Sequence, residues 1–253
     1  LVDGIFESAS GLVVGETLDR IASLRFLIES MPALARHAKT LYLRGLLSDF
    51  AQVELNRYFT SGNMTVDLRT YLTSLGTDPA GRFNPLELVQ VARANGVRVQ
   101  AIDCAASYKM KTPLPSIDEQ MMSTYLTNDI MTGDVYLNSP EKWIVVTDAH
   151  NTNTFRGLLG LSELKGGIGL RIEEVGPGTE LGMDVDPGVE VPRGSSPGGT
   201  VRQGNPDLLR ADLRLKVQVP EVTWTEETLE NLLYRRGMYL FEKTGDSYTL
   251  IHR

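Results

Sequence analysis

Residues 11–31 have the sequence GLVVGETLDRIASLRFLIESM, in which the spacing of the apolar residues changes part-way along. The first five residues form a short apolar run that ends in glycine, as expected for a buried strand before a tight turn. Beyond this run, apolar residues recur at helical spacing, at Ile21, Leu24, Leu27, Ile28 and Met31. The stretch therefore predicts a strand, a turn and a helix.

The same alternation continues along the chain. Further apolar strand candidates lie at 40–47, 97–103, 143–150, 168–175 and 211–219. Helical patterns lie between them, at 48–59, 65–75, 84–96 and 116–131. The clearest helix has Asn84 as its N-cap, Pro85 at its first position and Gly96 as its stop. Strand–helix–strand units need crossover connections, so we expect an α/β fold with a mostly parallel sheet flanked by helices on both faces.

The last third of the sequence has a different character. Residues 176–208 contain eight glycines and five prolines with little apolar pattern, which predicts a flexible loop or insertion. After the strand candidate at 211–219, residues 223–237 have a helical pattern, and residues 238–253 are typical of a β-hairpin. We expect residues 1–253 to form a single domain that ends in this helix and hairpin.

Composition excludes several classes of function. The 253 residues carry a formal net charge of −7 with no basic stripe, which argues against a nucleic-acid partner. No apolar run approaches the roughly 18 residues of a membrane span, so we do not expect an integral membrane protein. The chain begins without methionine and shows no signal peptide, and we expect it to be part of a larger multidomain chain.

Three of the predicted strands end at polar side chains that could share a site. Glu16 follows the first strand, Asp103 ends the strand at 97–103, and His150 ends the strand at 143–150. Because the carboxyl ends of parallel strands meet at one edge of a sheet, we expect these side chains to converge on a crevice. Two carboxylates and an imidazole could carry out general acid/base catalysis. The alternative is structural, with Glu16 in a first helical turn, Asp103 in an Asx-turn and His150 packed in a turn.

Four further side chains could support this site. Asp148 and Asn153 lie on either side of the strand-end histidine in the sequence. Arg20 and Arg44 each lie near a predicted strand end, where an arginine could pair with Glu16 or Asp103 or provide electrophilic support. A structural ion pair is the more common role of such an arginine.

The sequence offers little for a metal or a cofactor. Asp103, Asp148 and His150 could form a weak metal site, but the chain has three histidines and one cysteine in all. No nucleotide-binding or serine-hydrolase motif is present. Cys104, at the end of an apolar strand, is typical of a small buried hydrophobe rather than a nucleophile. We therefore expect neither a metal nor a cofactor.

Several segments, taken in order, resemble a known superfamily. The toxin and effector domains related to Tiki, TraB, ChaN and erythromycin esterase are similar to the chain over roughly residues 5–175. Toxin members include the C-terminal region of the Pasteurella mitogenic toxin and the Ras-specific endopeptidase of multifunctional RTX toxins. The segments are GLVVGETLDRIASLRFLIESM (11–31), TLYLRGLLSDFAQVELNRYF (40–59), NGVRVQAIDCAASYK (95–109) and WIVVTDAHNTNTFRGLLGLSELKGGIGLRIEEV (143–175).

The resemblance implies a secreted bacterial virulence effector that acts in the host cell cytosol on a host protein, with a small GTPase or its regulator as a candidate. It also implies a hydrolase-like fold in which Glu16 and His150 match two of the superfamily's site positions. Leu18 stands where a histidine is expected, and Arg44 and Gly45 stand where an acidic residue and a histidine are expected. Leucine cannot transfer a proton and arginine carries a fixed positive charge, so the acid/base site is partly degenerate.

Two functions follow from this comparison. In the first, the domain is a pseudoenzyme that keeps the fold and binds a host protein. In the second, it is an active hydrolase, a peptidase or an esterase, that uses Glu16, Asp103 and His150. The first is favoured because acid/base catalysis needs groups with tunable pKa values and one candidate histidine remains. A metal-dependent esterase or phosphoesterase is a third, weaker alternative.

Overall fold

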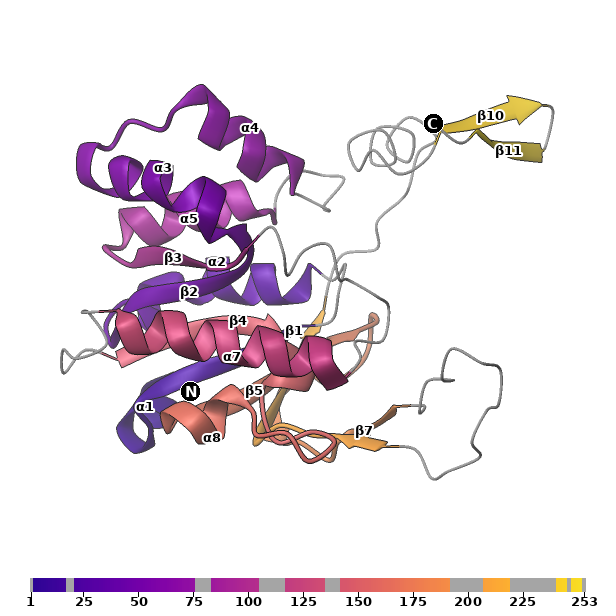
Figure 1. Cartoon of the computed structure of the whole chain (residues 1–253). Coiled ribbons are helices and arrows are strands. Elements are labelled where there is room, and N and C mark those ends of the chain that lie inside the picture. Colours follow the sequence, from indigo (N-terminus) through magenta and orange to yellow (C-terminus); the bar gives the residue numbers. More distant parts are fainter. Residues whose placement is uncertain are drawn as a thin grey trace.

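The structure is a computed structural model of the chain. It describes residues 2–16, 21–75, 83–104, 117–134, 142–191, 207–218, 240–244 and 247–251. Its main body is a seven-stranded sheet with helices on both faces (Figure 1), so the predicted α/β class is confirmed.

The sheet has the strand order β3-β2-β4-β1-β5-β9-β6. The first six strands in this order run parallel to one another, and β6 is an antiparallel edge strand. The strands are β1 (Gly11–Glu16), β2 (Ala38–Leu47), β3 (Arg98–Asp103), β4 (Lys142–Asp148), β5 (Ile168–Val175), β6 (Gly182–Val185) and β9 (Leu213–Gln218).

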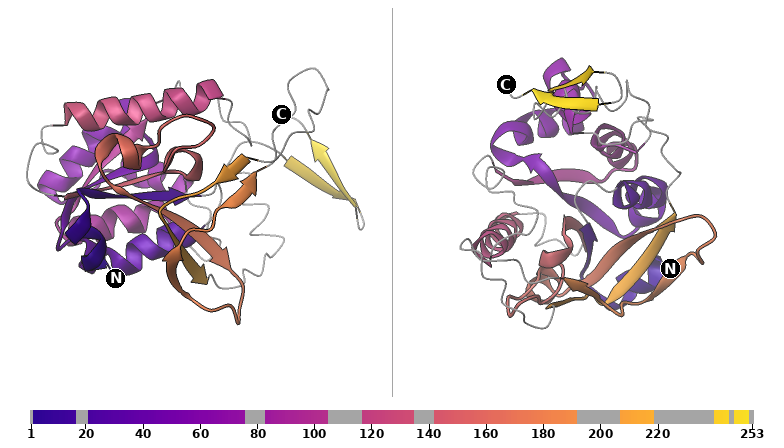
Figure 2. Two further views of the ribbon diagram at one scale, coloured as in Figure 1. Left: turned by 90° about the horizontal axis from the view of Figure 1, so that it is seen from below. Right: turned by 90° about the vertical axis from the view of Figure 1, so that its right-hand side faces the viewer.

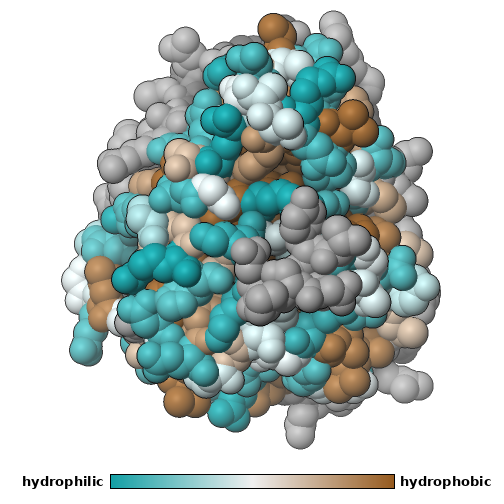
Figure 3. All heavy atoms as spheres, turned by 90° about the vertical axis from the view of Figure 1, so that its left-hand side faces the viewer, coloured by the Kyte–Doolittle hydropathy of each residue, from teal (hydrophilic) through white to brown (hydrophobic). Residues whose placement is uncertain are grey.

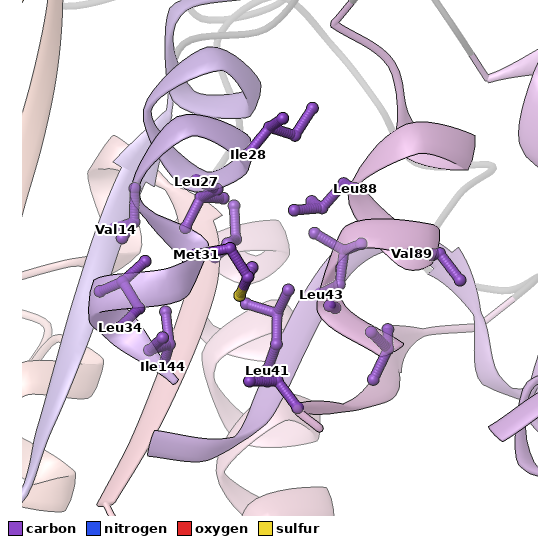
Figure 4. Close-up of a cluster of buried hydrophobic side chains, with 14 of the residues drawn as sticks. Val14, Leu27, Ile28, Met31, Leu34, Leu41, Leu43, Leu88, Val89 and Ile144 are labelled. Atoms are coloured by element: carbon purple, nitrogen blue, oxygen red, sulfur yellow. The ribbon is translucent and has the colours of Figure 1, made fainter. Parts of the chain in front are cut away.

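Successive side chains of the central strands point to opposite faces of the sheet, as strand geometry requires. On β1, Leu12 and Val14 belong to one buried cluster and Val13 to another. The first cluster also receives side chains from the helices α1 (Val2–Ser8), α2 (Ala22–Leu34), α3 (Ser48–Ser61), α4 (Val66–Ser74) and α5 (Pro85–Ala94). Figure 4 shows how α2 and α5 pack onto the strands in this cluster.

The second cluster lies on the other face. It is closed by Met131 of α7 (Ile117–Gly133) and Leu161 of α8 (Leu161–Lys165). The two further views in Figure 2 show the sheet as a middle layer between these two groups of helices. The predicted cap of α5 is confirmed, because the Asn84 side chain accepts a hydrogen bond from the Glu87 backbone N–H at 2.8 Å.

The strand order reverses direction between β1 and β4. The chain leaves β1 toward α2 on one face, and it leaves β4 toward α8 on the other. In open parallel sheets such a reversal creates a crevice at the carboxyl ends of the two strands. The topology therefore favours a site at the ends of β1 and β4.

The described part of the segment 176–208, residues 176–191 and 207–208, contains short strands. Beside β6, this segment contains β7 (Val189–Val191), which pairs with β8 (Asp207–Leu209). Of the two alternatives that the sequence left open, a flexible loop or an insertion, the strands at residues 182–185 and 189–191 favour the insertion. The carboxylate of the buried Asp186 accepts hydrogen bonds from the Arg171 side chain and from the Ala211 backbone and so holds the segment against the sheet.

Two elements were predicted near the C-terminus, a helix and a β-hairpin. The expected helix at 223–237 lies outside the described residues. The expected hairpin is confirmed as β10 (Leu240–Thr244) paired antiparallel with β11 (Ser247–Ile251). Within the described part of the chain, no helix is long and apolar enough to cross a membrane.

Candidate functional site

Four neighbouring strands place charged residues at one edge of the sheet. Across the order β3-β2-β4-β1 these residues are Asp103, Arg44, Asp148 and Glu16. Glu16 is directly opposite Asp148 in the parallel register of β1 and β4. These strand ends therefore lie along one edge of the sheet, with Arg44 and Asp148 in the middle of the row.

Arg44 and Asp148 form an ion pair in the centre of this row. Their side chains are only 10% and 12% exposed, so the pair is largely removed from water. From the sequence, Arg44 could pair with Glu16 or Asp103 or provide electrophilic support, and a structural ion pair was its more common role. The structure pairs it with Asp148 of the neighbouring strand β4, which separates β2 from β1 and therefore from Glu16. Asp103 lies on the other neighbouring strand, β3, where its carboxylate contacts the backbone of β2.

Asp103 has a structural contact with the neighbouring strand. Its buried carboxylate accepts a hydrogen bond from the Gly45 backbone N–H at 2.9 Å. Gly45 lies where the register of β2 against β3 shifts, between Leu43 and Leu47, and its φ of 85° is in the left-handed region that favours glycine. The carboxylate therefore holds an irregular strand end in place, which differs from both the catalytic role and the Asx-turn considered from the sequence.

Glu16 lies beside the start of α2. The Ser23 hydroxyl donates a hydrogen bond to its Oε2 at 2.8 Å, and Ser23 is itself buried. Both residues line a pocket of about 190 Å³, together with Arg171 and Glu173 of β5 and Val189 of β7. Of the three candidate catalytic groups, Glu16 is the one that borders this pocket.

His150 lies in the short 3₁₀ turn Ala149–Asn151 that follows β4. Its ring is half-buried and packs edge-on against Phe155, with 5.1 Å between ring centroids. Burial lowers the pKa of His150, and the positive charges of Arg156 and Arg44 lower it further. A lowered pKa favours the neutral imidazole at physiological pH. Among the described residues, the charged groups that shift this pKa are cations, whereas carboxylates usually orient a catalytic histidine.

Glu16 and Asp103 do not form a close pair. Their strands are separated by β4 and β2, and three steps of about 4.8 Å put the two backbones roughly 14 Å apart. The described residues contain no group of three His, Cys, Asp or Glu side chains that could hold a metal ion. The strand ends are thus brought to one edge of the sheet, but the three side chains have separate surroundings.

Two of the predicted supporting residues, Asn153 and Arg20, are still to be placed. The Asn153 amide donates to Asp212 Oδ2 at 3.1 Å, which ties it to the start of β9 rather than to the candidate site. Arg20 and Leu18 lie outside the described residues.

Sequence reasoning missed two residues near the pocket. Nothing in the sequence distinguished Ser23 as a site residue, because a serine in the first turn of a helix is common. Arg171 could have been noticed in the sequence, because it interrupts the apolar pattern of β5. A buried arginine needs an acidic partner. That partner is Asp186, whose two carboxylate oxygens accept from Arg171 at 2.8 and 2.7 Å.

Comparisons with known proteins bear on the fold. No family model matches the sequence. A segment of 105 residues is 33% identical to the multifunctional-autoprocessing repeats-in-toxin of Vibrio vulnificus, covering 41% of this chain and 2% of that toxin. The RRSP effector domain of a MARTX toxin from Vibrio vulnificus superposes with a TM-score of 0.55 and 21% identity, over 68% of this chain and 35% of that one. The chain has the fold of these toxin domains.

Two further solved structures share the fold. The C-terminal region of the Pasteurella multocida toxin, which has a thiol-protease-like catalytic triad, matches with a TM-score of 0.54 and 15% identity, over 89% of this chain and 27% of that one. The type III effector HopBA1 matches with a TM-score of 0.50 and 14% identity, over 87% of this chain and 94% of that one. The resemblance to toxin and effector domains that the sequence indicated is confirmed by these neighbours.

Proposed function

We propose that this chain is a toxin effector domain that acts on a host protein by binding it, with an acid/base site that no longer works as a catalytic unit. The observation that carries the proposal is the buried Arg44–Asp148 ion pair in the middle of the strand-end row. Support for the effector role comes from the toxin domains that share the fold and from the matching segment of the Vibrio toxin.

The electrostatics at His150 support the loss of catalysis. A general base must become positively charged when it takes a proton, and nearby carboxylates normally stabilise that charge. In the part of the chain that the structure describes, the charged groups that affect the pKa of His150 are Arg156 and Arg44, which destabilise the imidazolium. The carboxylate nearest to Arg44 is Asp148, and it is already used in the ion pair.

A second candidate function is a hydrolase that uses Glu16, Asp103 and His150. It is favoured by one observation, that Glu16 borders a pocket at the carboxyl edge of the sheet, where enzymes of this architecture bind their substrates. A neutral His150 could also accept a proton. This function requires the three groups to approach one another when a substrate binds.

One experiment separates the two functions. Purified chain is mixed with purified Ras-family GTPase, a host protein class suggested by the resemblance, and the mixture is analysed by size-exclusion chromatography and intact mass. We expect a stoichiometric complex with the GTPase mass unchanged. The complex should persist with His150→Ala and with the matched control His37→Ala, a histidine that pairs with Asp3 away from the site.

A hydrolase would give a different result in the same experiment. GTPase fragments that appear with the wild-type chain and His37→Ala, and disappear with His150→Ala, would establish the hydrolase. If the chain forms neither a complex nor fragments with any GTPase tested, this class of host target is refuted.

A further inference from the structure

A second concave region lies at the opposite edge of the sheet from the candidate site, where the parallel strands begin. A groove of about 820 Å³ is formed there by the starts of β2 and β3 and the last turns of α3 and α5. Figure 3 views the molecule from the side on which these strands begin, and hydrophilic residues predominate on that face. We call this region the basic groove; its principal side chains are Lys39, Asn56, Phe59, Thr60, Arg93 and Arg98.

The charge of the basic groove has one sign. Among the described residues, its lining includes three cations and no Asp or Glu, although the chain as a whole has a net charge of −7. Arg98 is neutralised by an ion pair with Asp134. Among the described residues, no carboxylate lies within ion-pair distance of Lys39 or Arg93. Within residues 2–16, 21–75, 83–104, 117–134, 142–191, 207–218, 240–244 and 247–251, two positive charges of the basic groove are therefore not paired with a carboxylate.

Both cations are held in place by neutral partners. The Lys39 ammonium donates to the Ala35 carbonyl at the end of α2, at 2.8 Å. Arg93 Nε donates to the Tyr58 carbonyl in α3 at 3.1 Å, and its guanidinium lies over the Tyr58 ring, 5.1 Å from the centroid. These contacts fix the positions of the charges without neutralising them, since a carbonyl carries no net charge. Each cation also keeps further N–H groups for another acceptor.

Lys39 and Arg93 are partly removed from water, and this raises the free-energy cost of leaving a cation without an anionic partner. Lys39 and Arg93 are half-buried, and buried cations are usually paired with an acidic group because partial desolvation is costly. An anion in the basic groove would offset that cost, and two preset donors reduce the entropy lost when it binds. Asn56 and Thr60 add polar groups at the rim, and the half-buried Phe59 adds an apolar surface.

We propose that the basic groove binds a phosphate-bearing ligand, with Lys39 and Arg93 contacting the phosphate oxygens and Phe59 contacting an apolar part of the same molecule. Phosphate fits because its several charged oxygens can accept hydrogen bonds from two cations at once. The volume lies within the range of small-molecule sites. A free organic phosphate and a phospholipid headgroup have this chemistry in common, and the experiment distinguishes them.

The test uses inorganic pyrophosphate as the probe, titrated into the complete chain by isothermal calorimetry at constant ionic strength. We expect saturable binding with one site per chain. Lys39→Gln should weaken it about tenfold or more, as the loss of one charge-assisted hydrogen bond implies. Lys39→Arg keeps the charge and should retain binding, and Lys165→Gln, a lysine in α8 on the other face of the sheet, should leave it unchanged.

A second arm identifies the source of the phosphate. Phosphatidylcholine vesicles with and without phosphatidylinositol phosphate are sedimented with the chain. Co-sedimentation that needs the anionic lipid and is lost in Lys39→Gln assigns the groove to a headgroup, whereas pyrophosphate binding alone assigns it to a free phosphate. Melting curves of each variant show that the fold is kept. The proposal is overturned if pyrophosphate and vesicles both fail to bind, or if folded Lys39→Gln binds as tightly as the wild type.

Discussion

Removing the Asp148 carboxylate should destabilise the domain strongly. In Asp148→Ala, the Arg44 guanidinium would remain largely buried without its partner, since the two side chains are only 10% and 12% exposed. Breaking a buried ion pair from one side costs about 3–5 kcal/mol, because the remaining charge is left uncompensated. In a domain of this size, that loss corresponds to a fall in melting temperature of about 6–20 °C. Urea denaturation followed by circular dichroism measures the change in the free energy of unfolding.

Two controls make this prediction sharper. Arg44→Met combined with Asp148→Leu removes both charges and should cost less than Asp148→Ala alone, since no unpaired charge remains. Arg57→Ala removes an exposed pair with Glu54, in which the arginine is 60% exposed, and should cost at most about 1 kcal/mol. If Asp148→Ala costs no more than Arg57→Ala, the pair is not a structural element of the site and the reasoning is refuted.

Three further variants test other parts of the structure. Gly45→Ala should lose about 1–2 kcal/mol of stability, measured by urea denaturation, because its φ of 85° is unfavourable for alanine although a Cβ would meet no neighbour within 4 Å; an unchanged midpoint would contradict the assigned backbone. Burial alone would raise the pKa of Asp186, but hydrogen bonds from Arg171 and two backbone N–H groups lower it. Asp186→Asn should therefore cost about 3–5 kcal/mol at pH 7. The difference from wild type should begin to shrink as the pH falls below about 4, where the carboxylate of the unfolded chain takes up a proton, and should be lost once the pH passes below the lowered pKa of the native carboxylate; a difference that does not change with pH would argue against an ionised pair. His150 should titrate by NMR below its usual 6.5, and Arg156→Gln should raise that midpoint; a midpoint above 6.5 would indicate a carboxylate partner.

The architecture was largely predictable from local patterns. Alternating apolar strands and amphipathic helices, such as α5 with its Asn84 cap, carry enough information to indicate crossover connections and a parallel sheet. The helix α7 shows the limit of this reasoning. Its position was predicted, but its buried face carries Gln120, Thr124 and Thr127, while Met121 and Tyr125 point to solvent. Periodicity located the helix. The usual assumption that apolar residues face inward would have predicted that Met121 and Tyr125 are buried, whereas both are exposed.

The site was only partly predictable. Strand ends could be located, so Glu16, Asp103 and His150, with Asp148 as a supporting residue, were expected at one edge of the sheet. The order of the strands could not be derived from the sequence, and that order decides that Arg44 meets Asp148. The backbone conformation at Gly45 and the anchoring of residues 182–191 by Asp186 also depend on contacts between distant segments. Such contacts leave no periodic signal in one sequence.

The central claim is that the domain acts on its host target without acid/base catalysis by Glu16 and His150. The most direct test delivers the chain into the host cytosol and compares the loss of cell viability caused by the wild type with that caused by the double variant Glu16→Gln, His150→Ala at equal intracellular levels. The account predicts the same loss of viability. Abolition of the effect by a double variant that melts at the wild-type temperature would contradict it.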